Sequence, residues 1–269
     1  MMKEAMLYQK LDNGRVQCNL CAHRCKINPG KRGICGVREN QGGTLVTLVY
    51  GKSISAAVDP IEKKPLYHYL PGTSAFSIAT VGCNFRCAFC QNADISQAPK
   101  ESRDLGRWAR DLPPERVVHL AEAYQCASIA YTYTEPTVFF EYAYDTAVIA
   151  TQHGLKNIFV TNGYMTPEAL DAIGENLHAA NVDLKSFRDE FYRKICGGRL
   201  QPVLDSIRKM HEMGVWVEVT TLVIPGHNDG DDEFKGIAEF LVSVDPDIPW
   251  HLSRFVPHYK MRDVPSTPV

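Results

Sequence analysis

Three cysteines at C-x3-C-x2-C spacing, Cys83, Cys87 and Cys90, constrain this 269-residue chain more than any other feature. They follow an apolar run, residues 76–81, whose composition predicts a β-strand. Thiolate sulfur is the preferred ligand of iron–sulfur clusters, and a [4Fe–4S] cube normally takes four such ligands. This loop supplies three. The spacing therefore predicts a cube whose fourth iron keeps an open position for a small molecule.

Closely spaced cysteines also occur in zinc knuckles, which use closed sets of four Cys and His ligands. No fourth ligand stands at short spacing from the three cysteines, and the loop follows a strand. We therefore favour the iron–sulfur site and keep structural zinc as the alternative.

With Phe89 directly before the last cysteine, the loop resembles that of the radical SAM enzymes. The resemblance implies that S-adenosylmethionine chelates the open iron and that Phe89 lies beside its adenine. It also implies that one-electron reduction cleaves this cofactor to a 5′-deoxyadenosyl radical, with the electron supplied by a low-potential donor of the ferredoxin or flavodoxin type.

Composition narrows the setting in which the chain works. The formal net charge is −2, so no basic excess favours nucleic acid. No run approaches the roughly 20 apolar residues of a membrane span, and residues 1–10 lack the apolar core of a signal peptide. Nine cysteines in a non-secreted chain are expected as reduced ligands rather than disulfides. We expect a cytoplasmic protein without nucleic-acid or membrane partners.

A second group of cysteines precedes the first. Its spacing is C-x2-C-x3-C-x9-C, in a segment with little apolar content, and its members are Cys18, Cys21, Cys25 and Cys35. Such a segment needs a staple, and four thiols predict a second metal site, either structural zinc or an auxiliary iron–sulfur cluster. His23 could replace one thiol, although four cysteines make that unnecessary.

The N-terminal part predicts a small region of its own. Residues 44–58 alternate apolar and polar with a break at Gly51, which predicts a hairpin, and residues 59–72 form a proline-bounded linker. We expect a Cys-rich segment, hairpin and linker over 1–72 and a barrel over 73–269, with the C-terminal end truncated after an apparent helix start.

Together these segments resemble the radical SAM enzymes of the AmmeMemoRadiSam system, which are related to the activases of pyruvate formate-lyase and other glycyl-radical enzymes. We expect the linker to cross the barrel mouth or to contact substrate. The candidate contacts are Lys63, Lys64, Tyr67 and His68.

Strand-like and helix-like segments alternate after the cysteine loop. The predicted strands are 76–81, 128–133, 157–161, 181–185, 215–224 and 250–256. Such alternation predicts an α/β fold with a parallel sheet and right-handed crossovers. Six units suit the partial (β/α)6 TIM-like barrel that the resemblance implies, with chemistry at the C-terminal ends of the strands.

The second strand end carries Glu135, in a segment that stands where the family has a Gly-Gly-Glu-Pro motif. The resemblance implies that Glu135 binds the amino group of the cofactor, and a carboxylate suits an ammonium group. Tyr133 and Thr134 replace the two glycines. The alternative role for Glu135 is a charge at a helix N-terminus.

Two further strand ends carry polar candidates. Asp183 and Lys185 are two apart and point the same way from a strand, as in the Asp-x-Lys motif of the activases, which lies near the methionine carboxylate. A buried ion pair is the alternative. Asn162 follows the strand before and lines the site or forms a plain turn.

The last strand ends are less informative. Ser253 and Arg254 are candidates for ribose or carboxylate oxygens, and His251 and His258 for a base or a packed histidine. An arginine that activases often carry is replaced near Thr220. We expect Cys126 and Cys196 to be structural.

The favoured function is a radical SAM enzyme that abstracts a hydrogen atom from an unidentified protein or small-molecule substrate. The resemblance suggests a target connected with the Memo- and AMMECR-type proteins, or a glycine on a partner enzyme as in the activases. A non-catalytic metal-binding adaptor is the third alternative, and it predicts a colourless ion at Cys83, Cys87 and Cys90.

Overall fold

The computed structural model describes residues 2–105 and 107–269. A seven-stranded sheet forms its centre, in the order β15-β14-β13-β12-β11-β9-β8. The strands are Ser55–Pro60 (β8), Ser74–Ala79 (β9), Ser128–Tyr131 (β11), Lys156–Thr161 (β12), Ala179–Asp183 (β13), Trp216–Val223 (β14) and Trp250–Arg254 (β15). The last six run parallel, which confirms the predicted α/β fold with its partial barrel.

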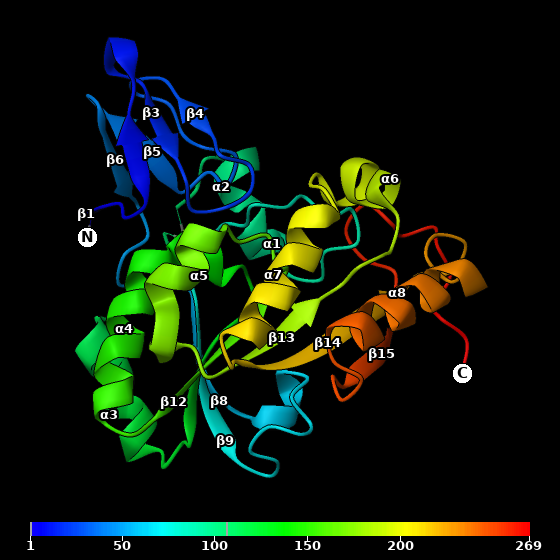
Figure 1. Cartoon of the computed structure of the whole chain (residues 1–269). Coiled ribbons are helices and arrows are strands. Elements are labelled where there is room, and N and C mark those ends of the chain that lie inside the picture. Colours follow the sequence, from blue (N-terminus) through cyan, green and yellow to red (C-terminus); the bar gives the residue numbers. More distant parts are fainter. Residues whose placement is uncertain (1, 106) are drawn as a thin grey trace.

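Helices follow the parallel strands and cover the outer face of the sheet (Figure 1). In Figure 1 the covering helices are Pro114–Ala123 (α3), Phe140–Gln152 (α4), Pro167–Ile173 (α5), Gln201–Glu212 (α7) and Asp231–Val244 (α8). The short helices Ala93–Ser96 (α1), Ala98–Glu101 (α2) and Asp189–Phe191 (α6) lie at the end of the barrel where the parallel strands finish (Figure 1). Helix α5 shows the local rules: the Thr166 side chain caps it by accepting from the Ala169 N–H, and Gly174, at φ 47°, ends it. Within the described residues no helix is long and apolar enough to span a membrane.

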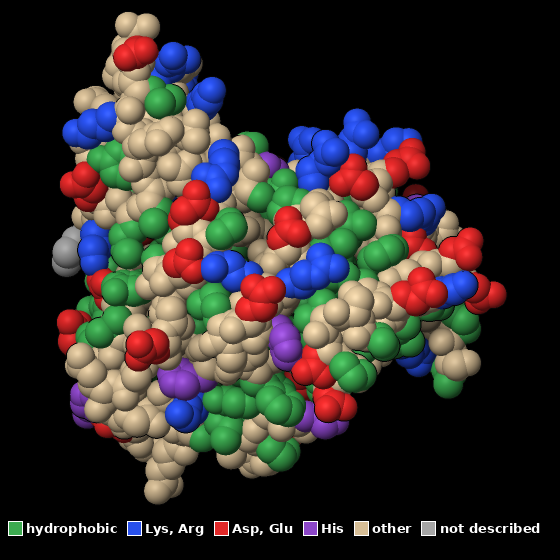
Figure 2. Space-filling model, in the orientation of Figure 1, with side chains coloured by type: hydrophobic (Ala, Val, Ile, Leu, Met, Phe, Trp, Pro, Cys, Tyr) green, Lys and Arg blue, Asp and Glu red, His purple; other side chains and the backbone are tan. Residues whose placement is uncertain are grey.

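The N-terminal segment forms a small β-rich module, seen in blue in Figure 1 and as a projecting lobe in Figure 2. Its strands are Lys3–Glu4 (β1), Tyr8–Lys10 (β2), Val16–Cys18 (β3), Lys26–Ile27 (β4), Arg38–Gln41 (β5) and Thr44–Thr47 (β6). Arg38 and Glu141 of α4 join the module to the barrel through a buried ion pair of 2.7 Å. The module is therefore fixed to the barrel rather than tethered to it.

The predicted hairpin over residues 44–58 is wrong. β6 pairs with β5 inside the module, whereas β8 pairs antiparallel with β9 at the edge of the barrel sheet. Gly51, at φ 66°, turns the chain between the two sheets, and Lys52–Ser53 (β7) pairs instead with Arg110–Asp111 (β10). Alternation alone reports a half-buried strand and not its partner. The boundary at residue 72 stays a prediction, although β8 on its N-terminal side belongs to the barrel sheet.

The linker closes the end of the barrel opposite to the one expected. Ile61 and Leu66 are fully buried, and they pack with residues at the N-terminal ends of the strands, among them Ala75 and Ala179. The prediction that the linker crosses the mouth is therefore wrong. Physically, β8 runs antiparallel to β9, so the connection between them has to lie where β9 begins.

The C-terminal segment forms no helix over residues 265–269. Thr267 instead donates its hydroxyl to the Val223 carbonyl at 2.6 Å and accepts from the Phe255 N–H at 2.7 Å. The segment thus lies along the ends of β14 and β15.

Candidate active site

A cavity of about 460 Å³ opens at the C-terminal ends of the parallel strands. Cysteines of the loop after β9 line one side of it, and polar side chains from the next strands line the other. The predicted residues on its wall are Cys83, Cys87, Phe89, Cys90, Glu135, Asn162, Asp183, Lys185 and Ser253. The sheet therefore brings together side chains that are up to 170 positions apart in the sequence, because parallel strands end at one edge.

The three thiols of the loop converge on this cavity while the backbone around them is held tightly. Cys83 Sγ accepts from the Phe85 N–H at 3.3 Å, and Cys90 Sγ lies 3.2 Å from Ser96 Oγ. Gly82 has φ 103°, and a Cβ there would lie 2.7 Å from Val37 of the N-terminal module. Only glycine fits this position without displacing Val37.

Burial raises the pKa of the Cys83 and Cys90 thiols above their ordinary values. Such groups are unfavourable as free thiolates, and a bound cationic centre is what would stabilise them in the charged form. Three converging thiols beside an open cavity fit an iron–sulfur cube with one iron left accessible, and no fourth cysteine thiol lines this cavity within the described residues.

A segment that sequence reasoning left out holds the cysteine loop from behind. The carbonyls of Ile195 and Cys196 accept from the N–H groups of Ala88 and Arg86, at 3.1 and 2.8 Å. A Cβ on Gly198 would lie 2.3 Å from Cε1 of Phe85. The sequence signal for this close packing is the pair of adjacent glycines at 197 and 198.

Cys196 is fully buried next to Cys87, and the hydrogen bond between these two thiols is the main reason that the pKa of Cys87 lies well above its ordinary value. Cys196 is thus a neighbour of the cluster loop. Its position in sequence, more than 100 residues away, gave no hint of this contact.

Glu135 is almost fully buried at the cavity wall, with 1% of its surface exposed. One oxygen accepts from the Thr137 N–H at 3.0 Å and the Thr161 hydroxyl at 2.7 Å, and the other accepts from the Asn162 N–H at 2.8 Å. Burial raises the pKa of Glu135, and these donors partly oppose the shift. Glu135 also caps the short helix Pro136–Phe139. It therefore has both predicted features, a charge at a helix N-terminus and a position on the cavity wall.

Asn162 connects the strand end to the cysteine loop. Its amide donates to Asn84 Oδ1 at 2.7 Å, and its Oδ1 accepts from the Tyr164 N–H at 3.0 Å. The same amide nitrogen lies 3.8 Å from Cys83 Sγ. Asn162 therefore both forms a turn and lies beside a cluster ligand.

Asp183 and Lys185 form an ion pair of 2.8 Å at the cavity. Burial disfavours the charged form of Lys185, but Asp183 and the nearby thiols outweigh it and hold the pKa of Lys185 well above its ordinary value. The Lys185 ammonium lies 5.7 Å from the centre of the Phe89 ring. A persistent positive charge therefore faces the cavity beside the aromatic residue.

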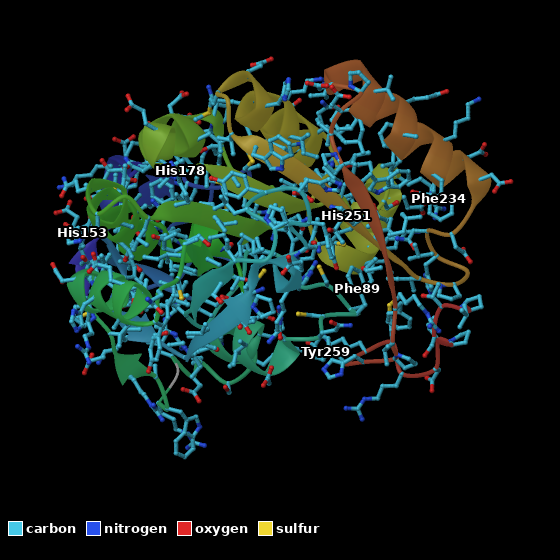
Figure 3. All side chains as sticks on the ribbon, turned by 90° about the horizontal axis from the view of Figure 1, so that it is seen from below. Phe89, His153, His178, Phe234, His251 and Tyr259 are labelled. Carbon is cyan, nitrogen blue, oxygen red and sulfur yellow. The ribbon has the colours of Figure 1, made fainter. Side chains whose placement is uncertain are left out.

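The two candidates on β15 lie on opposite sides of the strand. Ser253 lines the cavity, whereas Arg254 points outward, is exposed, and donates to the Thr267 carbonyl at 2.8 Å. Successive side chains on a strand face opposite sides, so both could not reach the site. Figure 3 labels Phe89 close to β15, the strand that carries His251.

Tyr133 occupies the place of a glycine in the family motif and keeps a glycine-like backbone, at φ 63°. Such a conformation is strained for a bulky residue and persists only where the surroundings hold it. Here the hydroxyl contacts Asp59, the ammonium of buried Lys64 lies 4.5 Å from the ring centre, and Asn92 donates to the Tyr133 carbonyl at 2.7 Å. Of the four linker candidates, Lys63 lines the cavity.

A loop with three cysteines at the strand ends of a partial α/β barrel fits the class of enzymes that use an iron–sulfur cluster with one open iron. The sequence model of the radical SAM superfamily matches residues 77–241, and this chain belongs to that superfamily. The family implies a [4Fe–4S] cluster and S-adenosylmethionine, and its members are enzymes.

Individual relatives agree with this assignment. The uncharacterized protein MJ0808 of Methanocaldococcus jannaschii is 46% identical over all of this chain and 79% of its own length. The pyruvate formate-lyase 1-activating enzyme of Escherichia coli is 25% identical over 59% of this chain and 65% of its own length. The solved structure of Streptococcus suis SuiB bound to the precursor peptide SuiA has a similar fold, with a TM-score of 0.52 at 13% identity, over 66% of this chain and 39% of SuiB.

Proposed function

We propose that this enzyme holds a [4Fe–4S] cluster on Cys83, Cys87 and Cys90 and abstracts a hydrogen atom from a substrate in the cavity. When bound there, the cluster supplies the electron that cleaves S-adenosylmethionine to a 5′-deoxyadenosyl radical. The observation that carries the proposal is the convergence of three thiols and the Glu135, Asp183 and Lys185 charges on one cavity.

The charges suit a zwitterionic cofactor. Glu135 offers an anionic acceptor to its ammonium group, and Thr137, Thr161 and Asn162 fix that carboxylate at the wall. Lys185 keeps its proton and offers a cation to the carboxylate of the cofactor. Phe89 lies beside that cation and provides an apolar face for the adenine.

The cavity also needs to limit side reactions, because a carbon radical abstracts hydrogen from any weak C–H or S–H bond within reach. The linker closes the barrel below the cavity, and Lys63 and Pro65 line its floor. The access route is therefore from the C-terminal ends of the strands. A protein segment or a small molecule would enter there.

For the substrate we favour an unidentified target connected with Memo- and AMMECR-type proteins. A glycine on a partner enzyme is the second candidate, and the Escherichia coli activating enzyme among the relatives supports it. We further propose a cytoplasmic location, with a ferredoxin- or flavodoxin-type donor and no nucleic-acid partner. The non-catalytic adaptor is less favourable, because a structural ion would not need this cavity.

We also propose that Cys18, Cys21, Cys25 and Cys35 bind a second metal centre. All four thiols line one cavity inside the N-terminal module. A module built of strands of two to four residues has little core of its own, so a metal would contribute directly to its folding.

The radical proposal is tested by reconstituting the protein anaerobically with iron and sulfide, reducing it, adding S-adenosylmethionine and measuring 5′-deoxyadenosine. We expect the nucleoside with the natural chain and none with Cys83→Ala. Cys126→Ala is the matched control, since Cys126 is buried outside the cavity. Nucleoside formation by Cys83→Ala at the natural rate would contradict the cluster assignment. A stable glycyl radical on an added partner enzyme would favour the activase.

A further inference from the structure

The four cysteines of the N-terminal module surround a cavity separate from the active site. Cys18 ends β3, Cys21 and Cys25 lie in the turn that leads to β4, and Cys35 precedes β5. Cys18 and Cys35 are buried, and the other two are partly buried. The thiols thus come from three segments and meet at one place, which is what a shared ligand requires.

The spread of the thiols favours one of the two occupants that the sequence left open, an iron–sulfur cluster over a single zinc ion. In a zinc site four sulfurs lie about 2.3 Å from the ion in a tetrahedron, so any two are only about 3.8 Å apart. Within the described residues, the one set of three Cys, His, Asp or Glu ligand atoms that all lie within 4.8 Å of one another is His68, Glu218 and His251. No three of the module's thiols are that close.

The active-site loop provides a comparison inside the same molecule. Cys83, Cys87 and Cys90 hold a cube in this family, and they too form no set within 4.8 Å. A polynuclear cluster places several irons between its thiolates, so its ligands have to stand farther apart than those of a single ion. The module's cysteines share the wider arrangement of the cube-binding loop.

A buried donor lines the module's cavity. Arg38 has 2% of its surface exposed, and Glu141 and the Met6 carbonyl accept from its terminal nitrogens. Its Nε is buried and has no hydrogen-bond partner among the residues that the structure describes. A buried unsatisfied donor calls for a partner, and thiolate or inorganic sulfide would supply an anionic acceptor.

His23 also lines this cavity but is committed elsewhere. Its Nε2 lies 2.9 Å from the carbonyl oxygen of Asn84 in the active-site loop, and its ring lies 4.8 Å from that of Tyr164. That contact uses one ring nitrogen of His23, and the four thiols form a complete ligand set without the other. Through His23 and Asn84, the module's cavity contacts the loop that carries Cys83.

We propose that Cys18, Cys21, Cys25 and Cys35 hold a second iron–sulfur cluster and not a single zinc ion. This inference rests on the proposed second metal site and names its occupant. The occupied protein then carries two clusters, with the module's cluster stabilised by the Arg38 guanidinium and connected to the active-site loop by His23.

The test removes the ligands of the active-site cluster and measures the metal that the four cysteines of the module still bind. In the full chain with Cys83, Cys87 and Cys90 all changed to Ala, iron, acid-labile sulfide and zinc are measured after anaerobic reconstitution. We expect about four irons and four sulfides per chain, with the brown absorbance of an iron–sulfur protein. Adding Cys18→Ser to this triple variant should abolish the bound iron and sulfide, whereas adding Cys126→Ser should leave their amounts unchanged.

The outcomes distinguish the nested proposals. One zinc per chain and no iron would overturn the cluster while leaving the second metal site in place. No metal of any kind would overturn the site itself. Neither result touches the radical chemistry, which the 5′-deoxyadenosine assay on the natural chain decides separately.

If the triple variant fails to fold, the natural chain gives the same answer. Two clusters predict about eight irons per chain, falling to about four in Cys18→Ser. The electron paramagnetic resonance spectrum of the reduced natural chain should contain one signal that S-adenosylmethionine changes and one that it does not change. About four irons with one zinc would overturn the inference.

Discussion

Nε2 of His251 lies 2.6 Å from Oε2 of Glu218, directly beneath the floor of the active-site cavity. Glu218 is fully buried, and its two oxygens also accept from the backbone N–H groups of residues 67–69. Two positions further along the same two strands, Thr220 and Ser253 line the cavity. One carboxylate therefore holds the linker in the place where it closes the barrel.

Changing Glu218 to Gln should loosen this floor. The substitution replaces a charged acceptor with a neutral amide, whose NH2 group faces N–H donors. We expect a loss of about 2 kcal/mol in the free energy of unfolding, measured by urea denaturation. Glu239, exposed on α8, supplies the matched control Glu239→Gln, for which we expect no change. Equal stability of both variants would show that the linker is held by its apolar contacts alone.

Glu218 also predicts how stability depends on pH. Burial alone would raise its pKa, but the N–H of Tyr67, His251 and the other donors outweigh burial, so its pKa in the folded protein lies below the ordinary value. An acid with a lowered folded pKa stabilises the protein above its unfolded pKa, and this contribution is lost as pH falls through the folded one. Between pH 6 and about pH 3, the natural chain should therefore lose more stability than Glu218→Gln. An identical slope for both would contradict this assignment.

The sequence predicted the barrel because its strands carry long apolar runs and its helices follow at regular intervals. It also predicted cavity residues at or just beyond the ends of strands, such as Asp183 and Glu135, since strand ends share one edge. Prediction from the sequence failed where the partner of a segment lies far away in the sequence. Nothing near Glu218 indicates that its partners are residues 67–69, and nothing near Cys196 indicates Cys87. Arg254 was misplaced because alternation along β15 could not be phased before the strand was seen.

Position 198 should accommodate no residue larger than glycine. A Cβ there would lie 2.3 Å from Cε1 of Phe85, and that ring is packed between Tyr164 and Tyr192, with ring centres at 4.9 and 6.1 Å. Gly198→Ala should therefore displace the cysteine loop at a cost of about 1–3 kcal/mol and lower the iron content after reconstitution. Gly230→Ala is the control, because no atom lies within 4 Å of a Cβ built there, and it should keep both its stability and its iron content. A normal iron content in Gly198→Ala would show that the loop tolerates this shift.

Glu135→Gln separates the two roles of this residue. Because burial raises the pKa of Glu135, loss of the charge alone should cost little, but the new NH2 group would face an N–H or O–H donor as in Glu218→Gln, so we expect a loss of about 1–3 kcal/mol in the free energy of unfolding. Loss of a charge-assisted contact to an ammonium group should weaken S-adenosylmethionine binding about 10- to 100-fold, as measured by equilibrium dialysis on reconstituted protein. Lower stability with unchanged cofactor affinity would make Glu135 a helix cap only.

Cys196 provides the sharpest check on the number of ligands at the active site. It is fully buried next to Cys87, yet Cys196 does not line the cavity, whereas Cys87 does. A neighbour that only contacts a ligand can be removed without losing the cluster, but a fourth ligand cannot. We therefore expect Cys196→Ala to keep its iron, its sulfide and its cleavage of S-adenosylmethionine, with a loss of about 1 kcal/mol in stability from the small void. Cys87→Ala, measured beside it, should lose the cluster. If Cys196→Ala lost it too, the cube would be fully ligated by protein, and no iron would remain open for the cofactor.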